Sequence, residues 1–83
     1  MKVEDIISGG SAYSCEFEVE TMLDVHGRVP NLSDTPLKGM CKYKSSGFIV
    51  ARDLDSRLLE VRDTESNQTF VVGFDDCWGI TEA

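Results

Sequence analysis

The first residues in this sequence whose types and spacing could do chemistry are two adjacent acids, Asp75 and Asp76. Carboxylate oxygens at a turn are suitable ligands for Mg²⁺ or Ca²⁺. Adjacent side chains of an extended segment point in opposite directions, however, and no Asp-x-Asp-x-Asp-Gly loop surrounds this pair. We therefore expect a solvated turn here and no metal site.

Nucleophilic catalysis would need a serine or cysteine beside a histidine and an orienting acid. His26 is the only histidine, and no pattern ties it to a cysteine. The three cysteines, Cys15, Cys41 and Cys77, include no Cys-x-x-Cys pair, which argues against zinc and against a secreted disulfide scaffold. We expect them to behave as small buried apolar residues, with Cys77 the most accessible. We expect no enzyme and no cofactor.

Phosphate and nucleic-acid binding have little support in the sequence. Residues 8–11 are rich in glycine and serine but lack the lysine and the helix of a phosphate loop. Tyr43 between Lys42 and Lys44 is the only hint of a basic aromatic groove, and alternation places the tyrosine on the opposite face from its lysines. Fifteen acids against eight bases give a net charge of −7, which repels nucleic acid and anionic membranes. We expect neither as a partner.

These residues must be positioned by strands, and residues 11–25 are the clearest one. Apolar and polar side chains alternate strictly there, as is typical of a half-buried antiparallel strand. Three glutamates lie on the polar side, where charge discourages aggregation through a sheet edge. The side chains expected to face inward are Tyr13, Cys15, Phe17, Val19, Thr21, Leu23 and Val25.

Residues 26–39 are predicted to form a long loop, because glycine, proline, asparagine and serine recur through them. Val29, Leu32 and Leu37 are expected to pin this loop to the core. Loops of this length are often functional, so a binding loop is expected here. Ahead of the first strand, residues 1–10 are predicted to be a helical turn or an arm.

The second half of the chain is one short apolar run after another, each closed by a turn signal. A tight turn at residues 45–47 is expected to separate the first two strands of this half, and a turn at 75–78 to precede the last one. The predicted strands cover residues 40–44, 48–53, 58–63, 68–74 and 79–81.

The composition predicts one small domain over residues 1–83. Its 41% hydrophobic content is too high for a disordered chain, but a domain this short has a small core and marginal stability, which a partner subunit would improve. No stretch is long enough for a signal peptide or a membrane span, so we expect a cytoplasmic protein. The residues expected to share the core are Phe17, Val19, Tyr43, Val50, Val61, Phe70 and Val72.

Charge is distributed unevenly along the sequence. Residues 27–52 carry five bases and one acid, whereas residues 1–24 and 53–83 are strongly acidic. The simplest explanation is that strands of opposite sign pair across the sheet. The alternative is a basic patch that recruits an acidic partner.

A long first strand, a long loop, short hairpin-linked strands and a terminal turn before a last strand resemble the small Src-homology-3-like barrel. The resemblance runs from Cys41 to Ile80, with residues 26–39 in the place of the long first loop of that barrel. It implies an all-β fold, with residues 11–81 in an antiparallel barrel of five or six strands. The paired aromatic motifs of the peptide-binding members are missing, so polyproline recognition is not implied. A short chain of this kind also resembles the orphan proteins of phages and mobile gene cassettes.

The function that we expect from the sequence is a non-enzymatic module acting through protein contacts, self-association included. Two alternatives are an acidic inhibitor that mimics nucleic acid and a barrel that binds a small molecule. Trp78 is expected either to anchor an interface or to plug the open end of the barrel. The expected binding residues are His26 and Arg28 in the loop, and Asp75, Asp76, Cys77 and Trp78 in the last turn.

Overall fold

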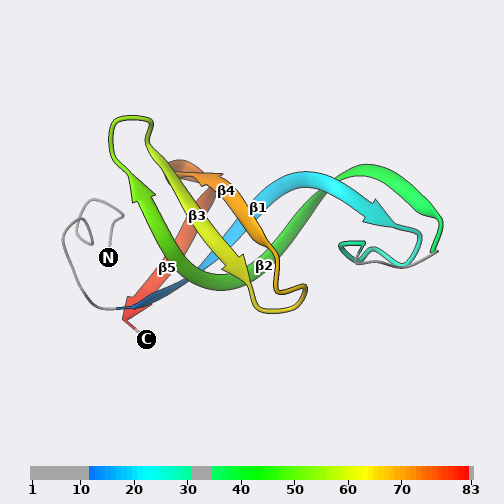
Figure 1. Cartoon of the computed structure of the whole chain (residues 1–83), viewed down its shortest axis with the longest axis horizontal. Coiled ribbons are helices and arrows are strands. Elements are labelled where there is room, and N and C mark those ends of the chain that lie inside the picture. Colours follow the sequence, from blue (N-terminus) through cyan, green and yellow to red (C-terminus); the bar gives the residue numbers. More distant parts are fainter. Residues whose placement is uncertain (1–11, 31–34, 83) are drawn as a thin grey trace.

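The structure, a computed structural model, describes residues 12–30 and 35–82. The strands lie side by side in the order β4-β3-β2-β1-β5, and every neighbouring pair is antiparallel (Figure 1). The all-β prediction is confirmed, and the predicted turn or arm at residues 1–10 lies outside the described residues. The elements are β1 (Tyr13–Asp24), β2 (Leu37–Asp53), β3 (Leu58–Asp63), β4 (Thr69–Gly73), the short 3-10 turn η2 (Phe74–Asp76) and β5 (Cys77–Glu82).

The sheet curls but does not close. β4 and β5 are its two edges, and within the described strands no ladder joins one to the other. The closed barrel predicted from the sequence is therefore not what the described strands form. The Src-homology-3-like arrangement stays a prediction.

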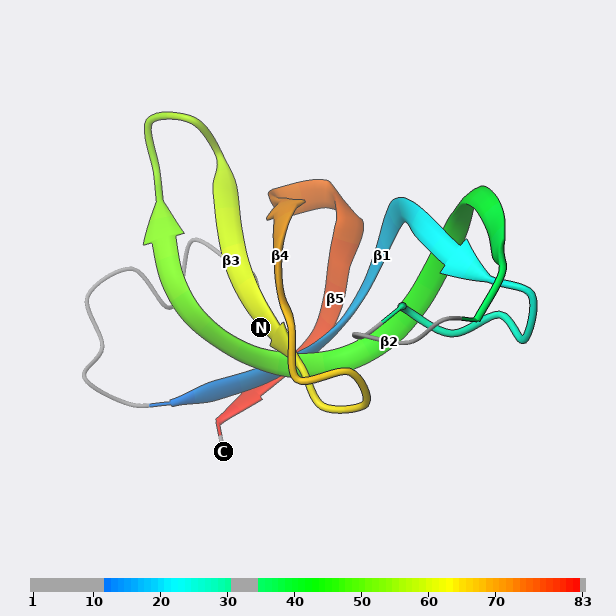
Figure 2. The same cartoon turned by 45° about the vertical axis from the view of Figure 1, so that its right-hand side comes forward.

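β2 is one continuous strand, where the sequence predicted two strands separated by a turn at residues 45–47. Figure 2 shows it as a long arch. Ser45 and Ser46 pair with β1, and Gly47 pairs with both β1 and β3. A Cβ atom on Gly47 would collide with the carbonyl oxygen of Arg62, so the glycine is there to let β3 cross closely. Residues 45–47 are thus a bend inside β2, next to which β3 packs closely. The prediction of a turn there was wrong.

A β-bulge at Val50 explains a second error in the predicted core. Ile49 pairs with Val61 and Ala51 pairs with Glu60, so Val50 is the extra residue on its strand. Val50 is 47% exposed, whereas Ile49 is buried. The prediction that Val50 faces inward was therefore wrong.

The core lies on the concave side of the curled sheet. Phe17 and Val61 are fully buried, and the rings of Phe17, Tyr43 and Phe70 lie 5.9–6.4 Å apart, centre to centre. Edge-to-face and tilted arrangements of this kind are favourable for aromatic rings. The other predicted core residues except Val50 are confirmed, because Val72 is buried and Val19 packs against the cluster.

The predicted loop at residues 26–39 and the predicted turn at residues 75–78 are both shorter than expected. β2 begins at Leu37, three residues before the predicted start of the strand at residue 40, and Leu37 is 56% exposed instead of pinning the loop to the core. Val29 does pack against the core, and Leu32 lies outside the described residues. At the other end, η2 replaces the predicted turn at 75–78, so that Cys77 and Trp78 already belong to β5.

Candidate functional site

The longest strands of the protein extend beyond the rest of the sheet as a two-stranded ribbon. β5 pairs with β1 only as far as Phe17, and β3 pairs with β2 only from Gly47 onward. Residues 18–24 of β1 and 37–44 of β2 therefore pair only with each other, and Figure 1 shows them reaching away from the other strands. We call these residues the hairpin arm. Two-stranded ribbons are at best marginally stable in water without something packed on them.

The outer face of the arm carries three cross-strand pairs of defined type. Glu18 faces Lys44, Glu20 faces Lys42, and Met22 faces Met40. The Nζ atoms of Lys44 and Lys42 lie 3.6 Å and 3.9 Å from the Glu18 carboxylate. The prediction that strands of opposite charge pair across the sheet is confirmed here. Each exposed ion pair contributes at most about 1 kcal/mol.

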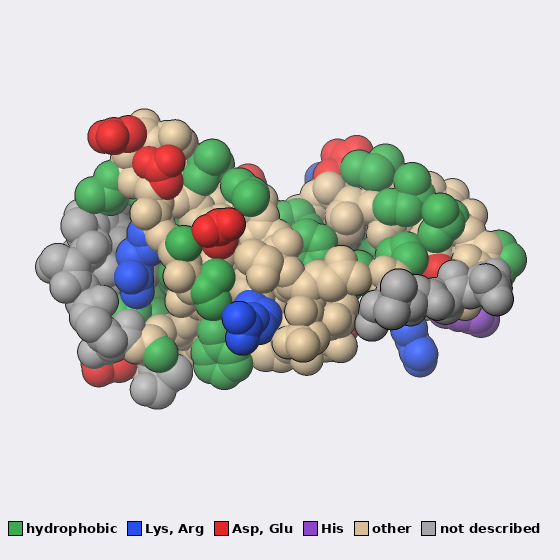
Figure 3. All heavy atoms as spheres, in the orientation of Figure 1, with side chains coloured by type: hydrophobic (Ala, Val, Ile, Leu, Met, Phe, Trp, Pro, Cys, Tyr) green, Lys and Arg blue, Asp and Glu red, His purple; other side chains and the backbone are tan. Residues whose placement is uncertain are grey.

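Four exposed apolar side chains lie at or just beyond the outer end of the arm. Met22, Val25, Leu37 and Met40 are 37%, 51%, 56% and 59% exposed. Figure 3 shows hydrophobic side chains gathered over the right-hand part of the molecule, where β1 and β2 run without other strands. Val25 was predicted to face inward, but the register shifts between Leu23 and Asp24, and it breaks the alternation at this point.

The turn after β1 is organised by the carboxylate of Asp24. Its Oδ1 atom accepts hydrogen bonds from the backbone N–H groups of His26 and Arg28, at 2.8 Å and 3.0 Å. The N–H of Arg28 and then that of His26 stabilise the charged form, so the pKa of Asp24 is below its ordinary value. His26 and Arg28 themselves are exposed.

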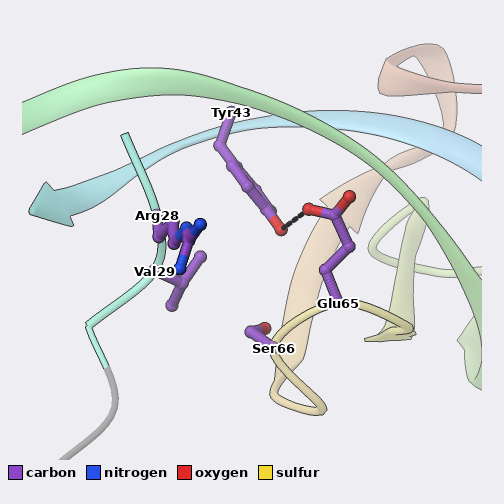
Figure 4. A pocket seen from close by; sticks show the side chains of 5 residues that line it. All are labelled: Arg28, Val29, Tyr43, Glu65 and Ser66. Atoms are coloured by element: carbon purple, nitrogen blue, oxygen red, sulfur yellow. Dashed lines mark hydrogen bonds between the residues drawn. The ribbon is translucent and has the colours of Figure 1, made fainter. Parts of the chain in front are cut away.

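A cavity of about 380 Å³ lies between this loop, the inner face of the arm and the turn that joins β3 to β4 (Figure 4). The loop contributes Arg28 and Val29, β2 contributes Tyr43, and the turn contributes Glu65 and Ser66. The Tyr43 hydroxyl lies 3.3 Å from Oε2 of Glu65. The cavity is thus lined by one cation, one carboxylate and two hydroxyl groups.

Behind the cavity, Asp63 is a fully buried carboxylate. It accepts hydrogen bonds from the hydroxyls of Tyr43 (2.5 Å), Ser45 (2.5 Å) and Ser66 (2.7 Å). The backbone N–H groups of Glu65 and Ser66 donate to it as well, at 3.3 Å and 3.2 Å. One side chain therefore ties together β2, β3 and the β3–β4 turn. From the sequence, Asp63 is predicted to be a solvated turn residue at a hairpin end, and this was wrong, because it continues the inward alternation of Leu59 and Val61.

This hydrogen-bond network stabilises the fold and does not activate a nucleophile. Burial and the bond to Asp63 both raise the pKa of Tyr43, so its phenol keeps its proton. Burial favours the neutral form of Asp63, but the hydroxyls of Ser45, Tyr43 and Ser66 outweigh it and hold its pKa below the ordinary value. The hydroxyls near the cavity already donate to this carboxylate.

Comparisons with models of protein families, with curated proteins and with solved structures found no match. Across residues 12–30 and 35–82 there is no group of three or more metal-binding side chains. The same residues include no helix long and apolar enough to cross a membrane.

The structure does not bring the predicted binding residues onto one surface. Arg28 lines the cavity described above, whereas Asp76 borders a shallow hollow with Glu18, Glu20 and Lys42 at the base of the arm. Trp78 borders a third hollow, beside Glu16 and Lys44. Trp78 is 43% exposed and lies outside the core cluster, so it is not a plug of the core. Asp75 is exposed in η2.

Cys77 was predicted to be the most accessible cysteine, and this was wrong. It lies at the start of β5 opposite Phe17, is only 8% exposed, and its thiol donates to the carbonyl of Phe74 at 3.4 Å. Cys15 is 2% exposed, and Cys41 on the arm is the half-buried one. Burial raises the pKa of Cys15 to about 12, and burial and Asp76 raise that of Cys77.

The three thiols are expected to react in a fixed order. With excess maleimide at neutral pH, Cys41 reacts first, and Cys15 and Cys77 react at least about tenfold more slowly because they must be exposed and ionised. Peptide mass spectrometry over a time course measures the three rates separately. Equal rates for Cys77 and Cys41 would contradict the position of β5, and labelling in denaturant serves as the control for complete reaction.

Proposed function

We propose that this protein is a non-enzymatic interaction module that contacts another protein through the hairpin arm. The observation that carries the proposal is the two-stranded ribbon with Met22, Leu37 and Met40 exposed on it and Val25 exposed just beyond its end. A clustered apolar surface bordered by charge is typical of protein–protein contact sites. Covering its outer face would also stabilise a ribbon with which no third strand pairs.

The charge pattern of the arm favours protein contact over the mimicry of nucleic acid. A mimic presents an unbroken row of acids, but here the glutamates of β1 alternate across the sheet with Lys42 and Lys44. The free state of all three cysteines supports a reducing compartment, so we keep the cytoplasm as the proposed location.

The cavity beside Tyr43 supports small-molecule binding as a second candidate function. Its volume of about 380 Å³ is within the range of about 300–1,000 Å³ that is usual for ligand sites. It is lined by both a guanidinium and a carboxylate. A small molecule that stays bound in native mass spectrometry, and is lost in an Arg28→Ala variant, would favour this candidate over protein contact.

A capture experiment with matched variants tests the proposed function. The full chain is immobilised and exposed to extract of its source cells as wild type, as an arm variant (Met22→Ser with Met40→Ser), and as a control variant (Phe48→Ser with Val50→Ser). Phe48 and Val50 are 45% and 47% exposed but lie outside the arm. All four side chains are partly exposed, so both variants should stay folded.

The expected result is a protein bound by the wild type and the control, and recovered at least about tenfold less by the arm variant. Equal recovery by the arm variant would contradict the proposal. Loss from the control variant alone would place the contact surface on β2 beyond the bend.

A further inference from the structure

We propose that the arm pairs with the arm of a second copy of this chain, outer face to outer face and pointing the same way. This inference rests on the proposed function, because it names the partner of the same surface. The two copies would be related by a two-fold axis that runs along the ribbon. The arrangement of charges on the arm favours this pairing.

Each strand of the arm carries one sign of charge on its outer face. β1 contributes Glu18 and Glu20, and β2 contributes Lys44 and Lys42 directly opposite them. The Lys42 and Lys44 side chains are 80% and 71% exposed, so they remain available to a further partner. Beyond the charges, Met22 and Met40 form an apolar end.

A two-fold rotation about the length of the ribbon exchanges the positions of β1 and β2. Glu20 of one copy then lies over Lys42 of the other, and Met22 lies over Met40. Every charged contact generated in this way joins opposite signs, and the apolar end of one arm packs against the apolar end of the other. An isologous contact of this kind closes after two copies.

The other two-fold ways of joining two arms bring like charges together. Rotation about an axis across the ribbon would stack Glu20 on Glu20. Joining two arms edge to edge through β1 would align one row of glutamates with another, and joining them through β2 would align lysines. Facing like charges are unfavourable, and charged edge strands prevent this type of pairing. Joining β1 of one copy edge to edge with β2 of the next would also bring opposite charges together, but that heterologous contact leaves a free edge at each end and does not close after two copies. Among closed two-fold arrangements, only the parallel face-to-face one joins opposite charges.

The size of the arm sets the strength of this contact. About seven residues of two neighbouring strands cover a face roughly 23 Å by 10 Å. That is well below the roughly 800 Å² per partner of a stable complex, so the dimer is weak and depends on concentration. We infer that the protein is a monomer at low concentration and forms the dimer as its own concentration rises.

Sedimentation equilibrium of the pure full chain tests the inference. The expected apparent mass rises from 9.2 kDa toward twice that value as the concentration increases from about 1 μM to about 1 mM. Glu20→Lys and Lys42→Glu should each weaken self-association by at least about tenfold, because each places like charges face to face. An equimolar mixture of the two variants should associate again, since the two faces are then oppositely charged.

A wild type that stays at 9.2 kDa throughout the series, or a Glu20→Lys variant that dimerises like the wild type, would overturn the inference. Circular dichroism melts verify that the variants are folded. If a single variant does not fold, the double variant Glu20→Lys with Lys42→Glu keeps the cross-strand pair and should dimerise like the wild type. A chain that stays monomeric but still captures a different protein through the arm would overturn this inference and support the proposed function.

Discussion

Replacing Asp63 by alanine is expected to lower the free energy of unfolding by about 3 kcal/mol or more. The carboxylate is fully buried and accepts three hydroxyl and two backbone hydrogen bonds. Without it, the Tyr43 and Ser45 hydroxyls and the N–H of Ser66 lose their acceptor inside the protein. In a domain of this size the loss corresponds to a fall of about 12 °C or more in the melting temperature.

Thermal and urea denaturation of the variant measure this effect. Asp75→Ala is the matched control, because Asp75 is an exposed carboxylate in η2 and its loss should change stability by less than about 0.5 kcal/mol. Equal stabilities for the Asp63 and Asp75 variants would show that the network around β3 is not formed.

The same carboxylate should make the protein sensitive to acid. Its pKa is lower in the folded chain than in the unfolded chain, so its contribution to stability is fully present above the unfolded value, near 3.8. That contribution is lost as the pH falls through the folded value. The wild type should therefore lose stability below about pH 4 more steeply than Asp63→Asn, which has no such charge to protonate.

Gly47→Ala is expected to cost about 3 kcal/mol or more, or to prevent folding, because the added methyl group has nowhere to go. Its Cβ would collide with the carbonyl oxygen of Arg62 and lie 2.8 Å from Cγ1 of Val61. The carbonyl oxygen of Arg62 is a backbone atom, so it can move away only if β3 separates from β2. A circular dichroism melt and one-dimensional NMR of the variant measure the outcome.

Gly27→Ala is the matched control for this substitution. Gly27 has a φ of +76° and nothing within 4 Å of its Cβ position, so the cost there is backbone strain alone, about 1 kcal/mol. If Gly47→Ala were no worse than Gly27→Ala, the close crossing of β2 and β3 would be wrong.

The strands that pack on one side were predictable from the sequence, because alternation records which face is buried. β1 and β3 follow that rule almost without exception, and both were predicted within two residues. The continuity of β2 was not predictable, since a serine-serine-glycine run is normally turn chemistry. The close approach of the Arg62 carbonyl on the neighbouring strand β3 is what requires a glycine at position 47.

The candidate site was only partly predictable, for the same reason. The outward position of Met22 and the glutamates could be read from alternation, but which strand would lie opposite them could not. The exposure of the arm depends on where β3 and β5 stop pairing, and that is a property of the whole sheet. Trp78 and His26 were singled out by residue type alone, and the structure places them apart.

The most direct test of the arm as the contact surface is an NMR titration of the ¹⁵N-labelled chain with its binding partner. The partner is either the unlabelled chain at high concentration or the protein recovered by capture. We expect the largest changes in amide chemical shift on residues 18–22 and 40–44. Changes centred on Trp78 and β5, or on Phe48 and Val50, with the arm unaffected, would contradict it.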